Sequence, residues 1–224
     1  MKEELKNPVW RALTEAQQEY AITYNGVAFF NADVCNFGAF IDKNNTIKAL
    51  DSYGALTDDF YIVGEQPEFS DVFFLKKEVP CFQMVLKDLK EPLYKEEIVL
   101  LDSSYIEEVY NLIWLVMPGY YKRKTFTLGS YYGIIKEGKL VAITGERLQS
   151  DIFIEVSAVV THPDYTGRGY AKQLVSYPTE EILKKNKLPI LHVAKSNSKA
   201  ISLYEKLGYE ILQTVIWRNF IAKK

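Results

Sequence analysis

The chain has 224 residues, 48% of them apolar and 25% charged, which is an ordinary composition for one large globular domain or two small ones. A formal net charge of -2 gives no broad positive field for a nucleic-acid partner, and two cysteines, Cys35 and Cys81, are too few for a disulfide framework. No apolar run approaches the roughly 18 residues of a membrane helix, and the start of the chain lacks the apolar core of a signal peptide. We therefore expect a cytoplasmic protein with no membrane partner.

The first half of the chain predicts an α+β unit. A helix is expected over residues 8–19 with Asn7 as its cap, followed by strands at 27–30, 46–50, 60–64 and 82–86. The many aromatic residues of this half are interpreted as core: Tyr53, Phe60, Tyr61, Phe69, Phe73, Phe74 and Phe82. The pattern changes near Pro92, so we place a boundary between about residues 93 and 98. This divides the chain into an N-terminal half, residues 1–95, and a C-terminal half, residues 96–224.

The second half has a regular order of elements. Its predicted strands lie at 98–101, 131–136, 140–147, 152–160 and 190–194, with two closing strands near 210–214 and 215–221. Ser103 or Ser104 is expected to cap a helix through about Val116, which Pro118 and Gly119 stop. The pair 131–136 and 140–147 is interpreted as a hairpin turning at Glu137 and Gly138. The short basic run of residues 122–124 is interpreted as a solvated loop.

A glycine-paced turn separates the strand 152–160 from an amphipathic helix that we expect to begin near Arg168. Gly167 and Gly169 can adopt backbone angles closed to other residues, and the free N–H groups of a helix N-terminus favour an anion. Arg168 adds a fixed charge beside them. The alternative is a turn that only joins the two elements. Pro178 lies inside this helix and predicts a kink or a short break near Tyr177, with a second helical piece to about Lys185.

A second helix follows the strand 190–194. Asn197 or Ser198 is suited to cap it, and Gly208 to end it. Ala200, Ile201, Tyr204 and Leu207 recur at helical spacing and form its apolar stripe. Tyr204 is therefore expected to face inward.

Together these two segments resemble the GNAT superfamily of acyl-CoA-dependent N-acetyltransferases, and within it most closely the FR47-like branch. The family has a six-residue turn with the pattern (Gln/Arg)-x-x-Gly-x-(Gly/Ala). In this sequence the six positions are Thr166, Gly167, Arg168, Gly169, Tyr170 and Ala171. The HPDY stretch before the turn and the N-x-x-A-x-x-x-Y-x-x-x-G-Y pattern from Asn197 to Tyr209 also match. Thr166 departs from the pattern because its hydroxyl brings no charge, so we expect weaker coenzyme binding.

The resemblance implies an α/β (α+β) fold, in which a mixed, mostly antiparallel central sheet is flanked by helices. It also implies that the amides of the turn bind the pyrophosphate of coenzyme A. In the family the strand before the turn ends in a bulge, past which two neighbouring strands part. This implies a free backbone N–H near Val159, Val160 or Thr161 that binds the thioester oxygen. The N-terminal half is interpreted as a possibly degenerate GNAT-like domain, which forms one wall of the acceptor cleft and binds no coenzyme of its own.

The resemblance also assigns roles to side chains. Tyr204 matches the acid that protonates the leaving sulfur, with a core tyrosine as the alternative, and Asn197 matches a pantetheine contact, with a helix cap as the alternative. Glu155 matches the general base, because a desolvated carboxylate can rise from about 4.3 toward a neutral pKa. Strand alternation puts Glu155 on one face with Phe153, Ser157 and Val159; its alternative role is to bind the acceptor's cation. His162 and His192 are weaker candidates.

These observations predict an acyltransferase that moves an acetyl or short acyl group from acetyl-CoA to an amine by direct attack in a ternary complex, with no metal. The acceptor is a small-molecule or peptide amine, and the protein is a monomer or a homodimer. The competing function is a non-catalytic acyl-CoA-binding regulatory module. A further alternative keeps the enzyme but replaces the donor with a longer acyl chain. The sequence does not identify the acceptor.

Overall fold

We describe a computed structural model of the chain, which covers residues 3–90, 94–119 and 121–223. Its helices are α1 (Pro8–Thr14), α2 (Thr46–Gly54), α3 (Ile106–Val116), α4 (Tyr170–Lys184) and α5 (Ser198–Lys206). Its strands are β1 (Ala21–Tyr24), β2 (Val27–Phe30), β3 (Phe37–Phe40), β4 (Asp59–Val63), β5 (Phe73–Leu86), β6 (Val99–Leu101), β7 (Tyr131–Lys136), β8 (Lys139–Gln149), β9 (Phe153–Thr161), β10 (Leu188–Ala194) and β11 (Tyr209–Ala222). None of the helices described is long and apolar enough to cross a membrane.

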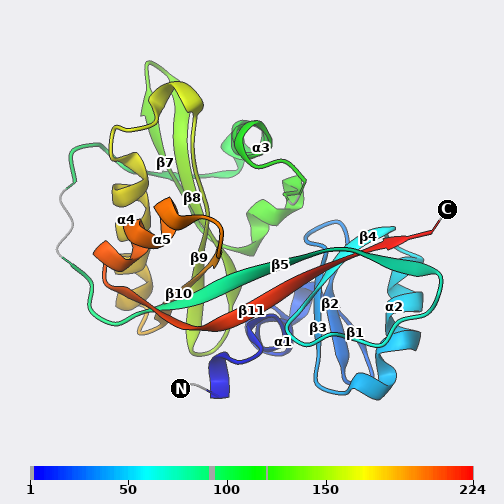
Figure 1. Cartoon of the computed structure of the whole chain (residues 1–224). Coiled ribbons are helices and arrows are strands. Elements are labelled where there is room, and N and C mark those ends of the chain that lie inside the picture. The colour runs from blue at the N-terminus through cyan, green and yellow to red at the C-terminus, as the bar shows by residue number, and fades with distance from the viewer. Residues whose placement is uncertain (1–2, 91–93, 120, 224) are drawn as a thin grey trace.

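The strands form one sheet in the order β1-β2-β3-β4-β11-β5-β10-β9-β8-β7-β6. The pairs β3–β4 and β9–β10 are parallel, and the other neighbours are antiparallel, which confirms the predicted mixed, mostly antiparallel sheet. The long strands β5 and β11 run side by side across the molecule and connect the part that holds α4 and α5 to the part that holds α2 (Figure 1).

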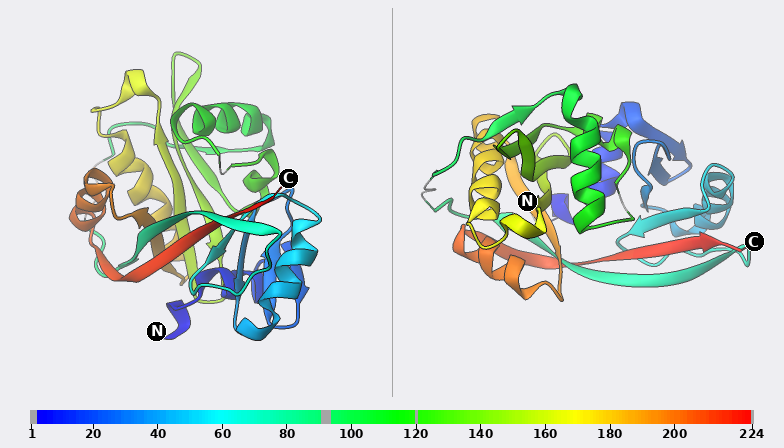
Figure 2. Two further views of the ribbon diagram at one scale, coloured as in Figure 1. Left: turned by 45° about the vertical axis from the view of Figure 1, so that its right-hand side comes forward. Right: turned by 90° about the horizontal axis from the view of Figure 1, so that it is seen from above.

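Helices cover both faces of the sheet in the C-terminal half. On β7, Tyr131 packs with α3 while its neighbour Tyr132 packs with α4, because successive side chains of a strand point to opposite faces. Ile154 and Val156 of β9 pack with α4 and α5. Figure 2 shows α3 on the opposite side of these strands from α4. The glycine turn and Tyr204 thus lie on elements of one layer.

Some predicted elements differ from those observed. Residues 46–50 are not a strand but the start of α2, because Thr46, Ala49, Leu50 and Tyr53 are buried at helical spacing. Of the predicted kink or short break near Tyr177, the break is wrong, because α4 runs through Pro178 as one helix; Leu174 and Ile182 on either side are fully buried.

The two predicted closing strands are a single strand, β11, with a bulge between Ile211 and Gln213. No turn residue interrupts the chain between Thr214 and Val215, and β11 pairs with β5 along its whole length. β5 precedes the predicted boundary and yet lies between β10 and β11. The division into halves therefore stays a prediction, and it matches no gap in the sheet; residues 91–93 at that boundary lie outside the described residues.

Other local predictions are confirmed. Asn7 caps α1 by accepting a hydrogen bond from the Trp10 N–H at 3.3 Å, and Asn197 caps α5. Most of the aromatic residues assigned to the N-terminal core are buried, whereas Phe74 is 43% exposed. α3 begins later than expected, because Asp102 caps a preceding 3₁₀ turn over Ser103–Tyr105.

Gly208 ends α5 as predicted, with a φ of +94°. A Cβ atom there would lie 1.8 Å from the backbone oxygen of Asp88. We expect Gly208→Ala to destabilise the protein by more than about 3 kcal/mol, because neither backbone can move away freely. Gly138→Ala is the control: its φ is +74°, but its Cβ would meet nothing within 4 Å, so only about 1 to 2 kcal/mol of backbone strain is expected. Equal losses in urea denaturation would contradict this explanation.

Candidate active site

The site begins where two parallel strands separate. β9 and β10 are paired only from Phe153 and Leu188 to Glu155 and Ile190. Beyond Glu155, no described strand pairs with β9 on its β10 side, so backbone N–H and C=O groups that point there are free for a ligand. The segment from Val159 to Thr161 lies beyond the paired residues, where a backbone N–H was expected to be free for a thioester oxygen.

A bulge follows at Ala158, whose φ is +49°. Between the pairs Gly145–Ser157 and Ile143–Val160, β9 contains one residue more than β8. The extra residue reverses the alternation, so Val159 packs with the cluster that contains Ile154 and Val156 rather than with Phe153. The expectation that Glu155 and Val159 share a face is therefore wrong.

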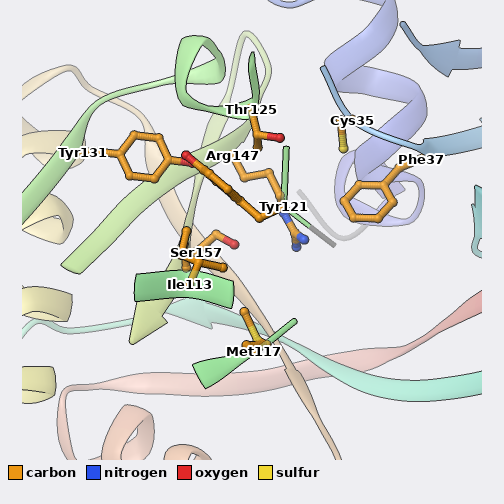
Figure 3. A pocket seen from close by; sticks show the side chains of 10 residues that line it. Cys35, Phe37, Ile113, Met117, Tyr121, Thr125, Tyr131, Arg147 and Ser157 are labelled. Carbon is orange, nitrogen blue, oxygen red and sulfur yellow. The ribbon is translucent and has the colours of Figure 1, made fainter. Parts of the chain in front are cut away.

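The separated strands open onto a cleft with two lobes. The larger has a volume of about 260 Å³, and its lining includes Tyr204, Asn197, His192 and Trp217. The smaller lobe, about 40 Å³, is lined by side chains from both halves of the chain (Figure 3). Both lobes share Phe37, Met117, Arg147, Ser157 and Ala158. The N-terminal half thus forms one wall of the cleft.

Glu155 is fully buried and held by two side chains. Arg147 donates from Nε and Nη2 to its carboxylate at 2.8 and 2.6 Å, and Nδ1 of His192 lies 2.7 Å from Oε1. Burial alone would raise the pKa of Glu155, but the charge of Arg147, followed by His192 and the hydrogen bonds from both, lowers it to about 2. The predicted rise toward neutral pKa is therefore wrong, since the sequence did not reveal these partners.

Tyr204 lies in the wall of the larger lobe and is 8% exposed. Its ring centroid is 6.4 Å from that of Tyr209, and its hydroxyl makes no hydrogen bond to the described residues. Burial raises the pKa of Tyr204 to about 12, so the hydroxyl keeps its proton at neutral pH. Asn197 lines the same lobe while its Oδ1 accepts from the Ala200 N–H at 3.2 Å. Asn197 can therefore cap α5 and still line the cleft.

The glycine turn is exposed and lies at the N-terminus of α4. Gly167 and Gly169 have φ of +77° and +78°, so the helix begins at Tyr170 rather than near Arg168. Among the residues that the structure describes, no side chain caps this helix, and a Cβ at either glycine would meet nothing within 4 Å. The first amides of α4, including those of Tyr170 and Ala171, thus lack a side-chain cap within the described residues. The Tyr170 side chain is buried, so only its backbone can serve a ligand.

Two side chains of the turn are held locally. The Thr166 hydroxyl donates to the Pro163 carbonyl at 3.1 Å. Arg168 donates to the Asp164 carbonyl at 3.3 Å, and its guanidinium lies 4.6 Å from the Tyr165 ring centroid. Arg168 therefore supplies the charge of the turn, because Thr166 has none.

The remaining candidates have structural partners. His162 accepts the Asp164 N–H in the turn before Thr166. His192 contacts Glu155, and its buried Nε2 has no hydrogen-bond partner in the described part of the chain. The basic run does not lie free: Arg123 pairs with Glu107 and Lys124 with Asp33. No group of His, Cys, Asp and Glu suited to a metal ion occurs among the described residues.

Sequence reasoning missed Arg147 and Trp217, although a basic residue on the strand next to Glu155 was a detectable signal.

Comparison with known proteins agrees with this geometry. Residues 131–218 match the family model for FR47-like proteins. An acetyltransferase of Yersinia pestis is 40% identical over 57 residues, which are 25% of this chain and 40% of that protein, and one of Sodalis glossinidius is 41% identical over 56 residues. The match thus spans about two fifths of the length of these relatives.

Solved structures share the whole fold. A GNAT-family acetyltransferase structure from Novosphingobium aromaticivorans superposes with a TM-score of 0.89 at 25% identity, over 99% of both chains. A GCN5-related N-acetyltransferase-like protein from Streptococcus suis has a TM-score of 0.65 at 17% identity, over 98% of this chain and 94% of that one, which shows the fold alone. The protein therefore has the GNAT fold, and its residues 131–218 match the FR47-like family of GNAT-related proteins.

Proposed function

We propose that the protein transfers an acetyl group from acetyl-CoA to an amine by direct attack in a ternary complex. One observation carries this proposal: the parting of β9 and β10 opens a cleft with Tyr204 in its wall, and the uncapped N-terminus of α4 lies just after β9. Free amides at a helix N-terminus suit a pyrophosphate, and the free edge of β9 suits an extended pantetheine arm.

The chemistry that the residues support has two parts. A backbone N–H on the free edge of β9 near Val159 can donate to the thioester oxygen and stabilise the charge that develops there. The Tyr204 hydroxyl, protonated at neutral pH, can donate its proton to the departing sulfur. The attacking amine must be neutral, so it loses its proton before or during attack.

Glu155 is poorly suited to take that proton directly. With a pKa of about 2 and no exposure, it stays ionised and is a weak base. We propose that Glu155 is a positioning residue that fixes Arg147 and His192 at the cleft. Among the described residues that line the larger lobe, His192 is the one histidine.

The test is acetyl-CoA with a panel of amines, following release of free coenzyme A and the acetylated product by mass spectrometry. Amine-dependent release supports the proposal. Acetyl-CoA binding without release for any amine supports the non-catalytic module instead. Faster turnover with longer acyl-CoA donors would replace acetyl by a longer chain.

Arg168→Ala is expected to weaken coenzyme A binding about tenfold, because one charge-assisted contact to phosphate is lost. Titration calorimetry measures this, and the difference should shrink in high salt. Pantetheine, which lacks the pyrophosphate, should show no difference between the two proteins. Lys184→Ala, at the other end of α4, is the matched control. An unchanged affinity for coenzyme A in Arg168→Ala would contradict the assignment of the turn.

A further inference from the structure

Resting on the proposed function, we infer that the amine acceptor carries a carboxylate that Arg147 binds, and that it is an apolar α-amino acid. The first observation is the charge of the cleft. Among the described residues that line its two lobes, Arg147 alone has a permanent charge, and none is Asp, Glu or Lys. A polycationic acceptor finds no carboxylate there, because Glu155 is enclosed behind Arg147.

The second observation is the free edge of the guanidinium. Arg147 uses Nε and Nη2 for the Glu155 carboxylate, whereas its Nη1 makes no hydrogen bond to the described residues. A guanidinium has five N–H donors, so the edge formed by Nη1 and Nη2 can hold a second carboxylate with two parallel hydrogen bonds. The Arg147 side chain is 19% exposed, and Figure 3 shows its nitrogen atoms reaching into the space between Phe37, Tyr121 and Ser157.

The third observation is that this edge is held in place before any ligand arrives. The guanidinium carbon lies 5.2 Å from the Phe37 ring centroid and 4.7 Å from that of Trp217. Glu155 fixes the guanidinium from behind and is itself fixed by His192. A positioned guanidinium loses little side-chain entropy when it binds an anion, so the contact is favourable although its charge is partly balanced by Glu155.

The position of Arg147 also constrains the rest of the acceptor. Arg147 lines both lobes together with Ser157 and Ala158, which directly precede Val159, near which the thioester is proposed to bind. An amine one carbon away from the carboxylate therefore stays close to that segment. The smaller lobe offers mostly apolar and aromatic walls, including Ile113, Met117 and Tyr131, for a side chain. An α-amino acid with an apolar side chain fits this arrangement.

The first test compares three acceptors that differ only at the carboxylate: leucine, leucinamide and isopentylamine. With the unmodified protein and acetyl-CoA, we expect kcat/KM for leucine to exceed that for each of the others by at least tenfold. Arg147→Lys keeps the charge but loses the fork, so it should lower kcat/KM for leucine more than tenfold and for leucinamide less than threefold. Arg11→Lys, in a partly exposed pair with Glu15 outside the lining of the cleft, is the matched control.

A binding measurement separates this inference from the proposed function. In the presence of coenzyme A, N-acetylleucine should bind to the unmodified protein at least tenfold more tightly than N-acetylleucinamide, as measured by calorimetry. Turnover of amines with no preference for the carboxylate would overturn the inference and leave the proposed function standing. Carboxylate-dependent binding without turnover of any amine would support the carboxylate site and overturn the proposed function. If no amine is turned over and no carboxylate-dependent binding is seen, both are wrong.

Discussion

Glu155→Gln is expected to destabilise the protein by about 3 to 5 kcal/mol, because it leaves the Arg147 guanidinium in a largely buried site without its counter-charge. The amide also replaces one acceptor oxygen by an NH₂ group that faces a donor. Chemical denaturation at pH 7 measures the loss of free energy of unfolding. Glu15→Gln removes the carboxylate of a more exposed pair with Arg11 and should cost less than about 1 kcal/mol.

The control for this explanation removes both charges. In Arg147→Met with Glu155→Leu, no charge is left buried, so most of the lost stability should return. A double variant as unstable as Glu155→Gln would show that the cost is steric and not electrostatic.

The same carboxylate makes stability depend on pH. Its pKa in the folded protein, about 2, lies below its ordinary value of 4.5, so its contribution is fully present above pH 4.5. That contribution, roughly 3 kcal/mol by the size of the shift, is lost as pH falls from 4.5 toward 2. Denaturation at pH 6, 4 and 3 should show this slope in the unmodified protein and a shallower one in the double variant.

Tyr204→Phe is expected to lower the rate of acetyl transfer by about 100-fold or more, because the departing sulfur loses its proton donor. The affinity for acetyl-CoA should change little, since the aromatic ring remains in place. Single-turnover measurements of coenzyme A release at saturating donor separate the chemical step from binding.

Tyr209 provides the matched control for Tyr204. It is a neighbouring buried tyrosine whose hydroxyl is hydrogen-bonded to Thr179 at 2.6 Å, in the core. Tyr209→Phe should therefore cost about 1 kcal/mol of stability and leave the rate unchanged. Equal rates in both variants, or no loss in Tyr204→Phe, would remove Tyr204 from the chemistry and leave it as a core residue.

Local signals predicted the elements that depend on local chemistry. The strand 131–136 is observed with the same bounds, and the caps Asn7 and Asn197 and the terminator Gly208 lie where their side chains or backbone angles require. The glycine turn is found between its strand and its helix, because left-handed backbone angles at Gly167 and Gly169 are encoded by the residues themselves.

The features that sequence reasoning missed depend on distant parts of the chain. The place of β5 between β10 and β11 requires pairing between residues more than 100 positions apart, which no periodicity reveals. The pKa of Glu155 was predicted in the wrong direction because burial was visible in the strand pattern but Arg147 and His192 were not assigned to it. The residues of β9 do not themselves indicate the bulge at Ala158, because no glycine or proline lies there; only the family resemblance implied a bulge in this strand.

The pairing of β5 with β11 also determines when the protein can fold during synthesis. β5 is made early, but its two neighbours in the sheet, β10 and β11, emerge from the ribosome only after residues 188 and 209. Until then both edges of β5 are open, and its apolar residues, such as the buried Met84, have no partner to cover them. The sheet can therefore close around β5 only after these two late strands have been made, and until then the open edges of β5 can pair with other strands.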